Sequence, residues 1–233
     1  MIPMTMARYV DEKYYQSAPP SSLSERLMVI ARDRIYADFM RRCRPGPDHT
    51  ILDVGVSDVV NDGANMLERK YPHPEKITAA GLGEADDFKK AFPAVTYVRI
   101  EANARLPFAD RAFDVATSNA VLEHVGSARN QAFFVAELLR VARMVFISVP
   151  NRYFPVEHHT AIPLLHFSDA GFAAACRWLG KTEWAEEANL ILMSRARLHA
   201  AVPAHVDAAI GHTGIPLGPF SSNLFVFIGG QHP

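Results

Sequence analysis

Short apolar runs alternate with longer amphipathic stretches along most of the chain. The first run, Ile51–Val54, is interrupted only by Asp53 and closed by Gly55, which is the pattern of a buried parallel strand ending in a tight turn. Residues Asn61–Tyr71 carry apolar side chains on one side and charged ones on the other, so they predict a helix. A strand, a small-residue turn and a helix form the opening unit of a nucleotide-binding α/β sheet, and we expect the rest of the chain to be organised around it.

The same alternation continues as far as Pro150. Further apolar runs predict strands, and the stretches between them predict helices. Strands and helices that alternate at these lengths imply right-handed crossovers and a mainly parallel sheet. The expected strands are Lys76–Leu82, Val95–Ile100, Phe113–Ser118 and Met144–Val149, and the expected helices are Ala85–Phe92 and Ala128–Val141.

The segments on either side of this core have a different character. Before it, Ser21, Ser22 or Ser24 can cap a helix that runs to Cys43. After it, Asn151–Phe167 is rich in proline, histidine and aromatic residues, which predicts a loop. The elements expected beyond this loop are a helix capped by Ser168 or Asp169 and running through Leu179, a helix over Asn189–Ala201, a final strand over Asn223–Ile228, and its antiparallel partner at His205–Ile210.

The chain shows no internal repeat and no low-complexity linker, so we expect its 233 residues to form one domain. Within this domain, residues 1–47 are expected to form an N-terminal arm and helix, and residues 48–150 a cofactor-binding core. Residues 151–204 are expected to form a substrate-side loop with a helical insertion, and residues 205–233 the C-terminal strands.

Composition narrows the class of protein. Apolar residues make up 49% and charged residues 21%, which is usual for a soluble globular protein. The formal net charge of -1 offers no electrostatic footprint for nucleic acid. No apolar run reaches the ~20 residues of a membrane span, and charges between Arg8 and Lys13 interrupt what a signal peptide would need. The isolated thiols Cys43 and Cys176 fit a reducing compartment, so we expect a cytoplasmic protein.

Two motifs at a characteristic spacing resemble a known family. The strand and turn read ILDVG, and the later segment reads LPFADRAFDVATSNAVLEHV. Over Ile51–Pro150 the chain resembles class I S-adenosylmethionine-dependent methyltransferases of the methyltransferase type 11 kind. The later run VPNRYFPVEHHTAIPLLHF is similar to a bacterial subfamily of these proteins. The resemblance implies a Rossmann-like, seven-stranded and mostly parallel sheet with its last strand antiparallel, and S-adenosyl-L-methionine lying across the carboxyl ends of the strands.

The resemblance also implies which residues meet the cofactor near the first two strands. Asp53 matches the acid near the cofactor's amino-acid end, and Gly55, Val56 and Ser57 match the glycine-rich turn, although only one glycine is present. The family's acid at the end of strand two normally binds both ribose hydroxyls. Gly81 stands in its commonest place, so the longer turn at Gly83 and Glu84 is expected to supply that carboxylate.

The residues after strands three and four match the adenine and sulfonium ends of the site. Asn119 and Ala120 are expected near the sulfonium, and His124 either contacts the cofactor or makes a structural hydrogen bond. Asn103, Ala104, Arg105 and Leu106 match the segment that holds the adenine edge through a side chain and backbone N–H groups, with Glu101 as a competing polar group.

The loop after strand five holds the candidate catalytic residues. A neutral imidazole of His158 or His159 can take a proton from a hydroxyl or amine, and Glu157 can orient it. A purely structural role for these side chains is the alternative. Three histidines, with His166 as the third, also suggest zinc. Adjacent histidines do not readily face one ion, however, and prolines separate His166 from the others, so we predict no metal.

The sequence therefore predicts direct, in-line transfer of a methyl group from S-adenosyl-L-methionine. The acceptor is expected to be a small molecule, a sugar or a lipid-linked compound rather than a nucleic acid, and the oligomeric state is left open. The alternative is an inactive cofactor-binding or scaffold protein with the same fold, which the glycine-poor turn and the shifted ribose acid motivate. A nicotinamide oxidoreductase is a third possibility, which Asp53 and the missing glycines argue against.

Overall fold

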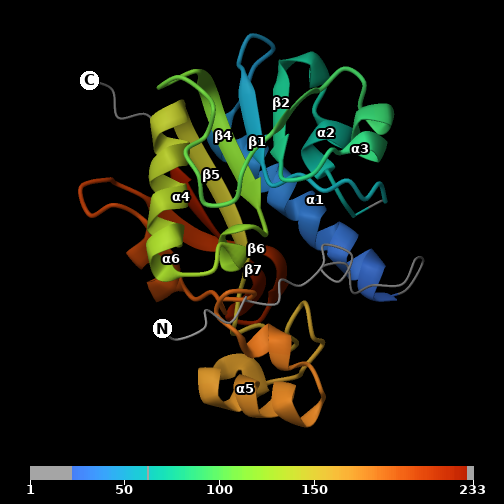
Figure 1. The fold of residues 1–233 in the computed structure, drawn as a ribbon, viewed down its shortest axis with the longest axis vertical. Helices are drawn as coiled ribbons and strands as arrows, with labels where there is room; N and C mark the ends of the chain where they lie inside the picture. The colour runs from blue at the N-terminus through green and yellow to red at the C-terminus, as the bar shows by residue number, and fades with distance from the viewer. Residues whose placement is uncertain (1–22, 62, 230–233) are drawn as a thin grey trace, which may run out of the picture.

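The computed structural model describes residues 23–61 and 63–229, so residues 1–22 of the expected N-terminal arm lie outside the described part. The strands are Ile51–Val54 (β1), Ile77–Gly81 (β2), Thr96–Arg99 (β3), Phe113–Asn119 (β4), Ala142–Pro150 (β5), Ala209–Leu217 (β6) and Phe220–Ile228 (β7). They form one seven-stranded sheet in the order β3-β2-β1-β4-β5-β7-β6 (Figure 1). β1 to β5 are parallel, and β7 is antiparallel to both of its neighbours. This confirms the expected Rossmann-like sheet with an antiparallel last strand.

Helices cover both faces of the sheet (Figure 1). Their bounds are Leu23–Cys43 (α1), Met66–Lys70 (α2), Asp86–Ala91 (α3), Ala128–Val141 (α4), Asp169–Trp178 (α5) and Arg195–Ala201 (α6). α1, α2 and α3 pack on one face around Phe39, Phe88 and Phe146, and α4 and α6 pack on the other around Leu138 and Leu198. Because both faces are buried, the strands read as nearly continuous apolar runs.

Several predicted elements have different bounds in the structure. The helix expected over Asn61–Tyr71 is only α2, because the chain before Met66 forms a long loop. The helix expected over Asn189–Ala201 begins at Arg195, where the Ser194 hydroxyl accepts a hydrogen bond from the backbone N–H of Arg197. β6 begins at Ala209, so the partner strand expected at His205–Ile210 is shifted towards the C-terminus. In α1, Ile35 and Phe39 are buried against the sheet, whereas Leu27 and Ile30 are more than two-fifths exposed.

A helical insertion follows β5, as expected from the break in the alternation. It consists of the short helical turns Leu165–Phe167 (η4) and Thr182–Ala185 (η5) with α5 between them, and Figure 1 shows α5 beyond the end of the sheet. Ser168 caps α5 by accepting a hydrogen bond from the backbone N–H of Gly171. The insertion has an apolar cluster of its own, formed by Ile162, Phe172, Ala175, Cys176, Trp184, Leu190 and Leu192. Across residues 23–61 and 63–229, no helix combines the length and the apolar character that a bilayer span requires.

The loop between β3 and β4, which contains the LPF motif, is fastened to α4 by one guanidinium group. Arg140 donates to the backbone oxygens of Leu106 and Phe108 at 2.9 and 2.8 Å. It also binds the carboxylates of Glu137 and Asp110 at 2.7 and 2.8 Å. Glu137 in turn accepts a hydrogen bond from the backbone N–H of Leu106 at 2.8 Å. Part of the motif that carries the family resemblance therefore serves the fold.

We expect Arg140→Ala to lower the free energy of unfolding by roughly 2–4 kcal/mol, because the Phe108 carbonyl and the Glu137 carboxylate lose their donors. Urea unfolding followed by circular dichroism measures the change. Arg143→Ala is the matched control, since the Arg143 side chain is exposed and reaches Asp114 only at 3.7 Å. It should cost less than about 1 kcal/mol. Equal effects of the two substitutions would contradict the structural role of Arg140.

Candidate cofactor site

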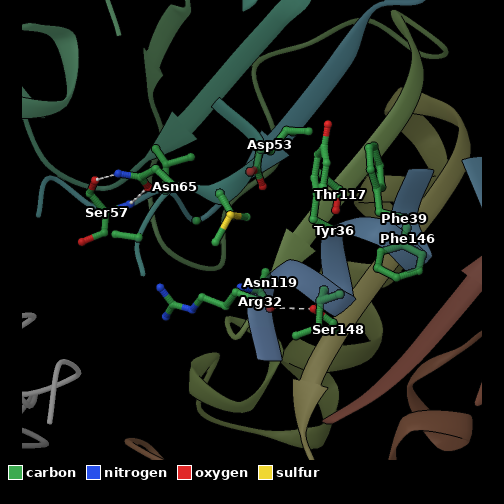
Figure 2. A pocket seen from close by; sticks show the side chains of 16 residues that line it. Arg32, Tyr36, Phe39, Asp53, Ser57, Asn65, Thr117, Asn119, Phe146 and Ser148 are labelled. Atoms are coloured by element: carbon green, nitrogen blue, oxygen red, sulfur yellow. Dashed lines mark hydrogen bonds between the residues drawn. The ribbon is translucent and has the colours of Figure 1, made fainter. Parts of the chain in front are cut away.

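A cavity of about 110 Å³ lies where β1, β4 and β5 end, beside α1 (Figure 2). In open α/β sheets, ligands bind at the carboxyl ends of the strands. Four elements meet here, because β1 and β4 are hydrogen-bonded neighbours and α1 packs across the same edge. Polar side chains in the lining come from α1, from β1 and from the neighbouring strands: Arg32, Tyr36, Asp53, Thr117, Asn119 and Ser148.

The turn after β1 needs its one glycine for packing. Gly55 has a φ of 99°, and a Cβ placed there would lie 2.1 Å from Cγ2 of Val121. Substituting Gly55 would therefore disturb the fold before it blocked a ligand. The rest of the loop is held by Asn65, whose side chain accepts from the N–H of Ser57 at 3.1 Å and donates to its carbonyl at 2.8 Å. The conformation of this turn is therefore fixed by the hydrogen bonds of an asparagine side chain, in a loop that lacks the further glycines of a glycine-rich turn.

Two carboxyl groups, of Asp53 and Glu68, lie against each other at the end of β1. Asp53 aside, no group among the residues that the structure describes donates a hydrogen bond to a side-chain oxygen of Glu68. Burial raises the pKa of Asp53 well above its ordinary value, and the nearby Glu68 raises it further. Burial likewise raises the pKa of Glu68 to about 7. Two carboxyls form a hydrogen bond only when one is protonated, so the pair holds a proton at neutral pH.

A positive charge from α1 enters the same cavity. Figure 2 shows Arg32 extending sideways from α1 along the cavity, with Asp53 at the end of β1 above it. The Arg32 guanidinium donates a hydrogen bond to the backbone oxygen of Gly63. Burial lowers the pKa of Arg32 to about 10, which still leaves it charged at neutral pH. The cavity therefore offers an acidic wall and a cationic wall to a single ligand.

The structure brings five of the predicted cofactor residues to this cavity. Asp53, Gly55, Val56, Ser57 and Asn119 all line it. The Asn119 side-chain oxygen accepts a hydrogen bond from the Ser148 hydroxyl at 2.6 Å, as drawn in Figure 2. Ala120 follows with a φ of 56°, and its N–H donates to the Ser148 carbonyl at 2.9 Å.

The predicted ribose residues lie outside the cavity lining. Glu84 is exposed and forms an ion pair with Arg99 at the end of β3. The Gly83 carbonyl accepts a hydrogen bond from the Tyr97 hydroxyl at 2.7 Å. A Cβ at Gly81, the usual place for the acid, would lie 2.8 Å from the Tyr97 hydroxyl oxygen, so this tyrosine fills the space that a longer side chain would need.

The predicted adenine segment also lies outside the cavity lining, and one of its members needs a correction. Leu106 is buried, and because Glu137 already accepts its N–H, that group is not available to an adenine ring. Asn103 is exposed with a φ of 55°, and Ala104 donates weakly to Glu101 at 3.4 Å. Arg105 is exposed and lies 3.8 Å from Asp110.

The predicted catalytic residues form a second, buried cluster. Glu157 accepts hydrogen bonds from Nδ1 of His159 at 2.8 Å and from the Thr160 hydroxyl at 2.6 Å. His159 Nε2 lies 3.1 Å from Nε2 of His124, whose Nδ1 donates to the Asn189 carbonyl at 2.7 Å. His124 therefore makes a structural hydrogen bond, one of its two expected roles, and it does not line the cavity at β1.

The pKa values of His158 and His159 are shifted in opposite directions. Burial opposes charge on His159, but its hydrogen bond to Glu157 and the charge of that carboxylate raise its pKa above the ordinary value. The same histidine lowers the pKa of Glu157 against the effect of burial. Burial lowers the pKa of His158 to about 4, so its imidazole is neutral at pH 7. At pH 7 His158 is therefore the neutral imidazole, whereas Glu157 favours the protonated form of His159.

Three functional features were missed by sequence reasoning. Arg32 and Tyr36 of α1 were not assigned to the cavity, and Glu68 was placed on the wet side of a helix. Asp58, in the loop after β1, accepts hydrogen bonds from the backbone N–H groups of Asp87 and Phe88 in the first turn of α3, both at 2.9 Å. Glu68 lies in the first turn of the short helix α2 and is buried, a direction that the longer helix expected from the sequence did not indicate.

Comparisons with known proteins agree with the fold. A family model described as a methyltransferase domain matches residues 73–144. No curated protein matches the sequence. A structure of a SAM-dependent methyltransferase from Aquifex aeolicus is 16% identical with a TM-score of 0.52, covering 93% of this chain and 96% of that one. Protein PH0226 from Pyrococcus horikoshii OT3 is 12% identical with a TM-score of 0.61, covering 95% and 100%.

A third structure, N-methyltransferase NodS from Bradyrhizobium japonicum WM9 in complex with S-adenosyl-L-homocysteine, is 10% identical with a TM-score of 0.52, covering 86% of this chain and 87% of that one. At these identities the shared property is the fold. The fold is that of class I S-adenosylmethionine-dependent methyltransferases, and the resemblance seen in the sequence is confirmed. S-adenosyl-L-methionine is the cofactor that the family model and the fold indicate.

The carboxyl pair gives a prediction about stability. Between about pH 4.5 and 7 the unfolded chain loses the Glu68 proton while the folded chain keeps it, so the pair lowers stability as pH rises. Glu68→Gln keeps a donor towards Asp53 without that cost. We expect it to raise Tm at pH 8 by roughly 2–4 °C, equivalent to about 1 kcal/mol, and to flatten the pH dependence of Tm.

Scanning calorimetry at several pH values measures this effect. Glu75→Gln, which changes an exposed acid in the turn before β2, is the matched control and should leave the profile unchanged. A lower Tm for Glu68→Gln at pH 8 would mean that the Glu68 carboxylate is stabilising.

Proposed function

We propose that this protein is an S-adenosyl-L-methionine-dependent methyltransferase that binds the amino-acid end of its cofactor in the cavity at β1. The observation that carries the proposal is the placement of the Asp53–Glu68 carboxyl pair and the Arg32 guanidinium around one cavity at the carboxyl edge of a methyltransferase-type sheet. The methionine end of the cofactor carries an ammonium and a carboxylate. It is therefore complementary in charge to these two walls.

The residues present fit the cofactor at this end. Apart from Asp53, no described residue donates to the buried Glu68 oxygens, and an ammonium brought beside Asp53 would supply positive charge to the pair. Arg32 can bind a carboxylate through the remaining N–H groups of its guanidinium. A volume of about 110 Å³ is below the roughly 300–1,000 Å³ of pockets that enclose a whole ligand. The cavity thus suits one end of the cofactor, with the nucleoside along the strand edge.

The bound cofactor supplies an electrophilic methyl group on its sulfonium, so the protein's own task is to align an acceptor and to remove its proton. Asn119 and Ser148 lie at the ends of β4 and β5, on the edge where this acceptor would approach. We propose that the insertion after β5 forms the acceptor side of the site and that a small molecule, a sugar or a lipid-linked compound binds there. His158 remains the candidate general base, being neutral at pH 7.

A second candidate function is cofactor binding without transfer. The observation that favours it is the ion pair between Glu84 and Arg99, which holds the expected ribose acid on the exposed side. Binding of S-adenosyl-L-homocysteine does not distinguish the two functions. Methyl transfer to an acceptor library, with radiolabelled S-adenosyl-L-methionine as the donor, does.

The proposal predicts how the cofactor product binds. Titration calorimetry with S-adenosyl-L-homocysteine should show one site, and Arg32→Met should weaken binding by roughly ten- to a hundred-fold through loss of a charge-assisted contact. Arg34→Met, in an exposed arginine of the same helix, is the matched control and should bind like the parent. Because the ammonium favours the ionised carboxyl pair, affinity should rise between about pH 6 and 8 with release of a proton, and Glu68→Gln should remove this dependence. Unchanged binding by folded Arg32→Met would refute the placement.

The ribose assignment has its own test. If Glu84 turns to the ribose hydroxyls, Glu84→Ala should weaken S-adenosyl-L-homocysteine binding by roughly ten- to a hundred-fold. Arg99→Ala releases the same carboxylate from its ion pair, so this variant should bind at least as tightly as the parent. If Glu84→Ala leaves the dissociation constant unchanged, another group meets the ribose.

A further inference from the structure

Two imidazole rings meet nitrogen to nitrogen at the junction of the sheet and the insertion. Nε2 of His124, in the turn Leu122–His124 (η3) after β4, lies 3.1 Å from Nε2 of His159, in the loop after β5. The two rings are nearly perpendicular, at 88°, with centroids 4.8 Å apart. Trp184 of the insertion packs against the His159 ring, with ring centroids 5.2 Å apart.

The other nitrogen of each ring is fixed by an acceptor. Nδ1 of His124 lies 2.7 Å from the backbone oxygen of Asn189, and a carbonyl can only accept a hydrogen bond, so Nδ1 carries the proton. Nδ1 of His159 lies 2.8 Å from Glu157, which the backbone N–H groups of His159 and Thr160 also hold. This is the arrangement that orients metal-binding histidines, with a carboxylate or a carbonyl behind each ring and the Nε2 lone pair in front.

A buried carboxylate completes the set. Glu123 is 1% exposed, and neither of its side-chain oxygens has a hydrogen-bond donor among the described residues. Its Oε1 lies 3.9 Å from Nε2 of His124. A buried carboxylate without donors is costly unless it takes up a proton or meets a cation, and a bound metal ion would supply the cation. A proton shared between the two imidazoles would give both Nε2 atoms a hydrogen-bond partner. It would leave the two Glu123 side-chain oxygens without a direct partner in the part of the chain that the structure describes.

We propose that Glu123, His124 and His159 bind a divalent first-row transition-metal ion, of which Zn²⁺ is the natural example. Ligand nitrogens at about 2.0–2.1 Å from such an ion lie roughly 2.8–3.4 Å apart when they are neighbours in its coordination shell. The separation of 3.1 Å between the two Nε2 atoms falls in this range. All three ligand atoms lie within 4.8 Å of one another, and the Glu123 carboxylate, with Oε1 3.9 Å from Nε2 of His124, has to turn towards the ion to complete the set. Two imidazoles and a carboxylate suit zinc, iron or cobalt rather than magnesium or calcium, which prefer oxygen ligands.

The surroundings allow a further ligand. A small cavity of about 10 Å³, close to the volume that one water occupies by this measure, is lined by Glu123 and His159 together with Arg152 and Met193. A water there can serve as the fourth ligand. The ion would join η3 at the sheet to the loop that leads into the insertion, so its binding should raise the thermal stability of the whole chain.

Titration with Co²⁺ tests the site, because bound cobalt gives visible absorption bands that report its ligands. Tag-free, chelator-treated protein should bind one Co²⁺ per chain and lose the bands when Zn²⁺ is added, whereas Mg²⁺ should leave them unchanged. Zn²⁺ should also raise Tm. The site does not rest on the proposed methyl transfer, and neither readout requires an acceptor or the cofactor.

Variants locate the ion. Glu123→Gln removes a ligand at nearly constant shape, and it should weaken Co²⁺ binding at least tenfold while the metal-free protein stays folded. His124→Ala and His159→Ala should abolish binding, and Glu157→Gln, which acts through His159, should weaken it by roughly ten- to a hundred-fold. His199→Asn is the matched control, because His199 is exposed on α6 and does not line this cavity. Absence of stoichiometric Co²⁺ binding, or binding that survives in Glu123→Gln and His159→Ala, would overturn the proposal.

Discussion

The contact between the Asp53 and Glu68 carboxyls is the constraint on which the candidate cofactor site depends. Two acids buried together lower stability, and the fold keeps them at the end of β1, where the sheet opens to ligands. Arg32 lies across the cavity but does not neutralise the pair directly, because its guanidinium reaches the Gly63 carbonyl instead. The negative potential at β1 is therefore left for a ligand to satisfy. Sites with this kind of unmet charge are preorganised, since the cost of assembling them is already met by folding.

The order of elements could be predicted from the sequence for two reasons. Strands that are buried on both faces consist of apolar runs, and helices that are buried on one side have apolar residues at helical spacing. Ala128–Val141 is the clearest case, since Ser127 caps it and its apolar positions recur at helical spacing. The helix expected over Asn61–Tyr71 failed for a physical reason. Asn65 adopts a φ of 51° and uses its side chain to close the loop after β1, a task that periodicity does not record. The ends of β6 shifted for a similar reason, because pairing with β7 and not local pattern sets them.

The site was harder to predict than the fold because a motif does not say which of its atoms are already in use. The N–H of Leu106 and the ring of His124 stood in positions matched to the cofactor, yet each has a partner within the protein. Arg32 could not be predicted as a site residue because it belongs to no motif. An arginine on a long helix resembles a surface residue, and only tertiary packing brings α1 to the carboxyl edge of the sheet. Residues far apart in sequence, such as His124 and His159, meet only through the connection between β4, β5 and the insertion.

The insertion has an apolar cluster that is separate from the two clusters on the sheet, and this separation affects local unfolding and the tolerance to substitution. Ile162, Phe172 and Trp184 bury their side chains against one another rather than in the two clusters that cover the sheet. Such a unit can open on its own while the sheet stays intact, so its amide protons should exchange with solvent through a lower barrier than those of β4 and β5. Substitutions inside it are then tolerated without loss of the sheet. If the insertion forms the acceptor side as proposed, that side is thus free to diversify, while the edge proposed for the cofactor stays fixed.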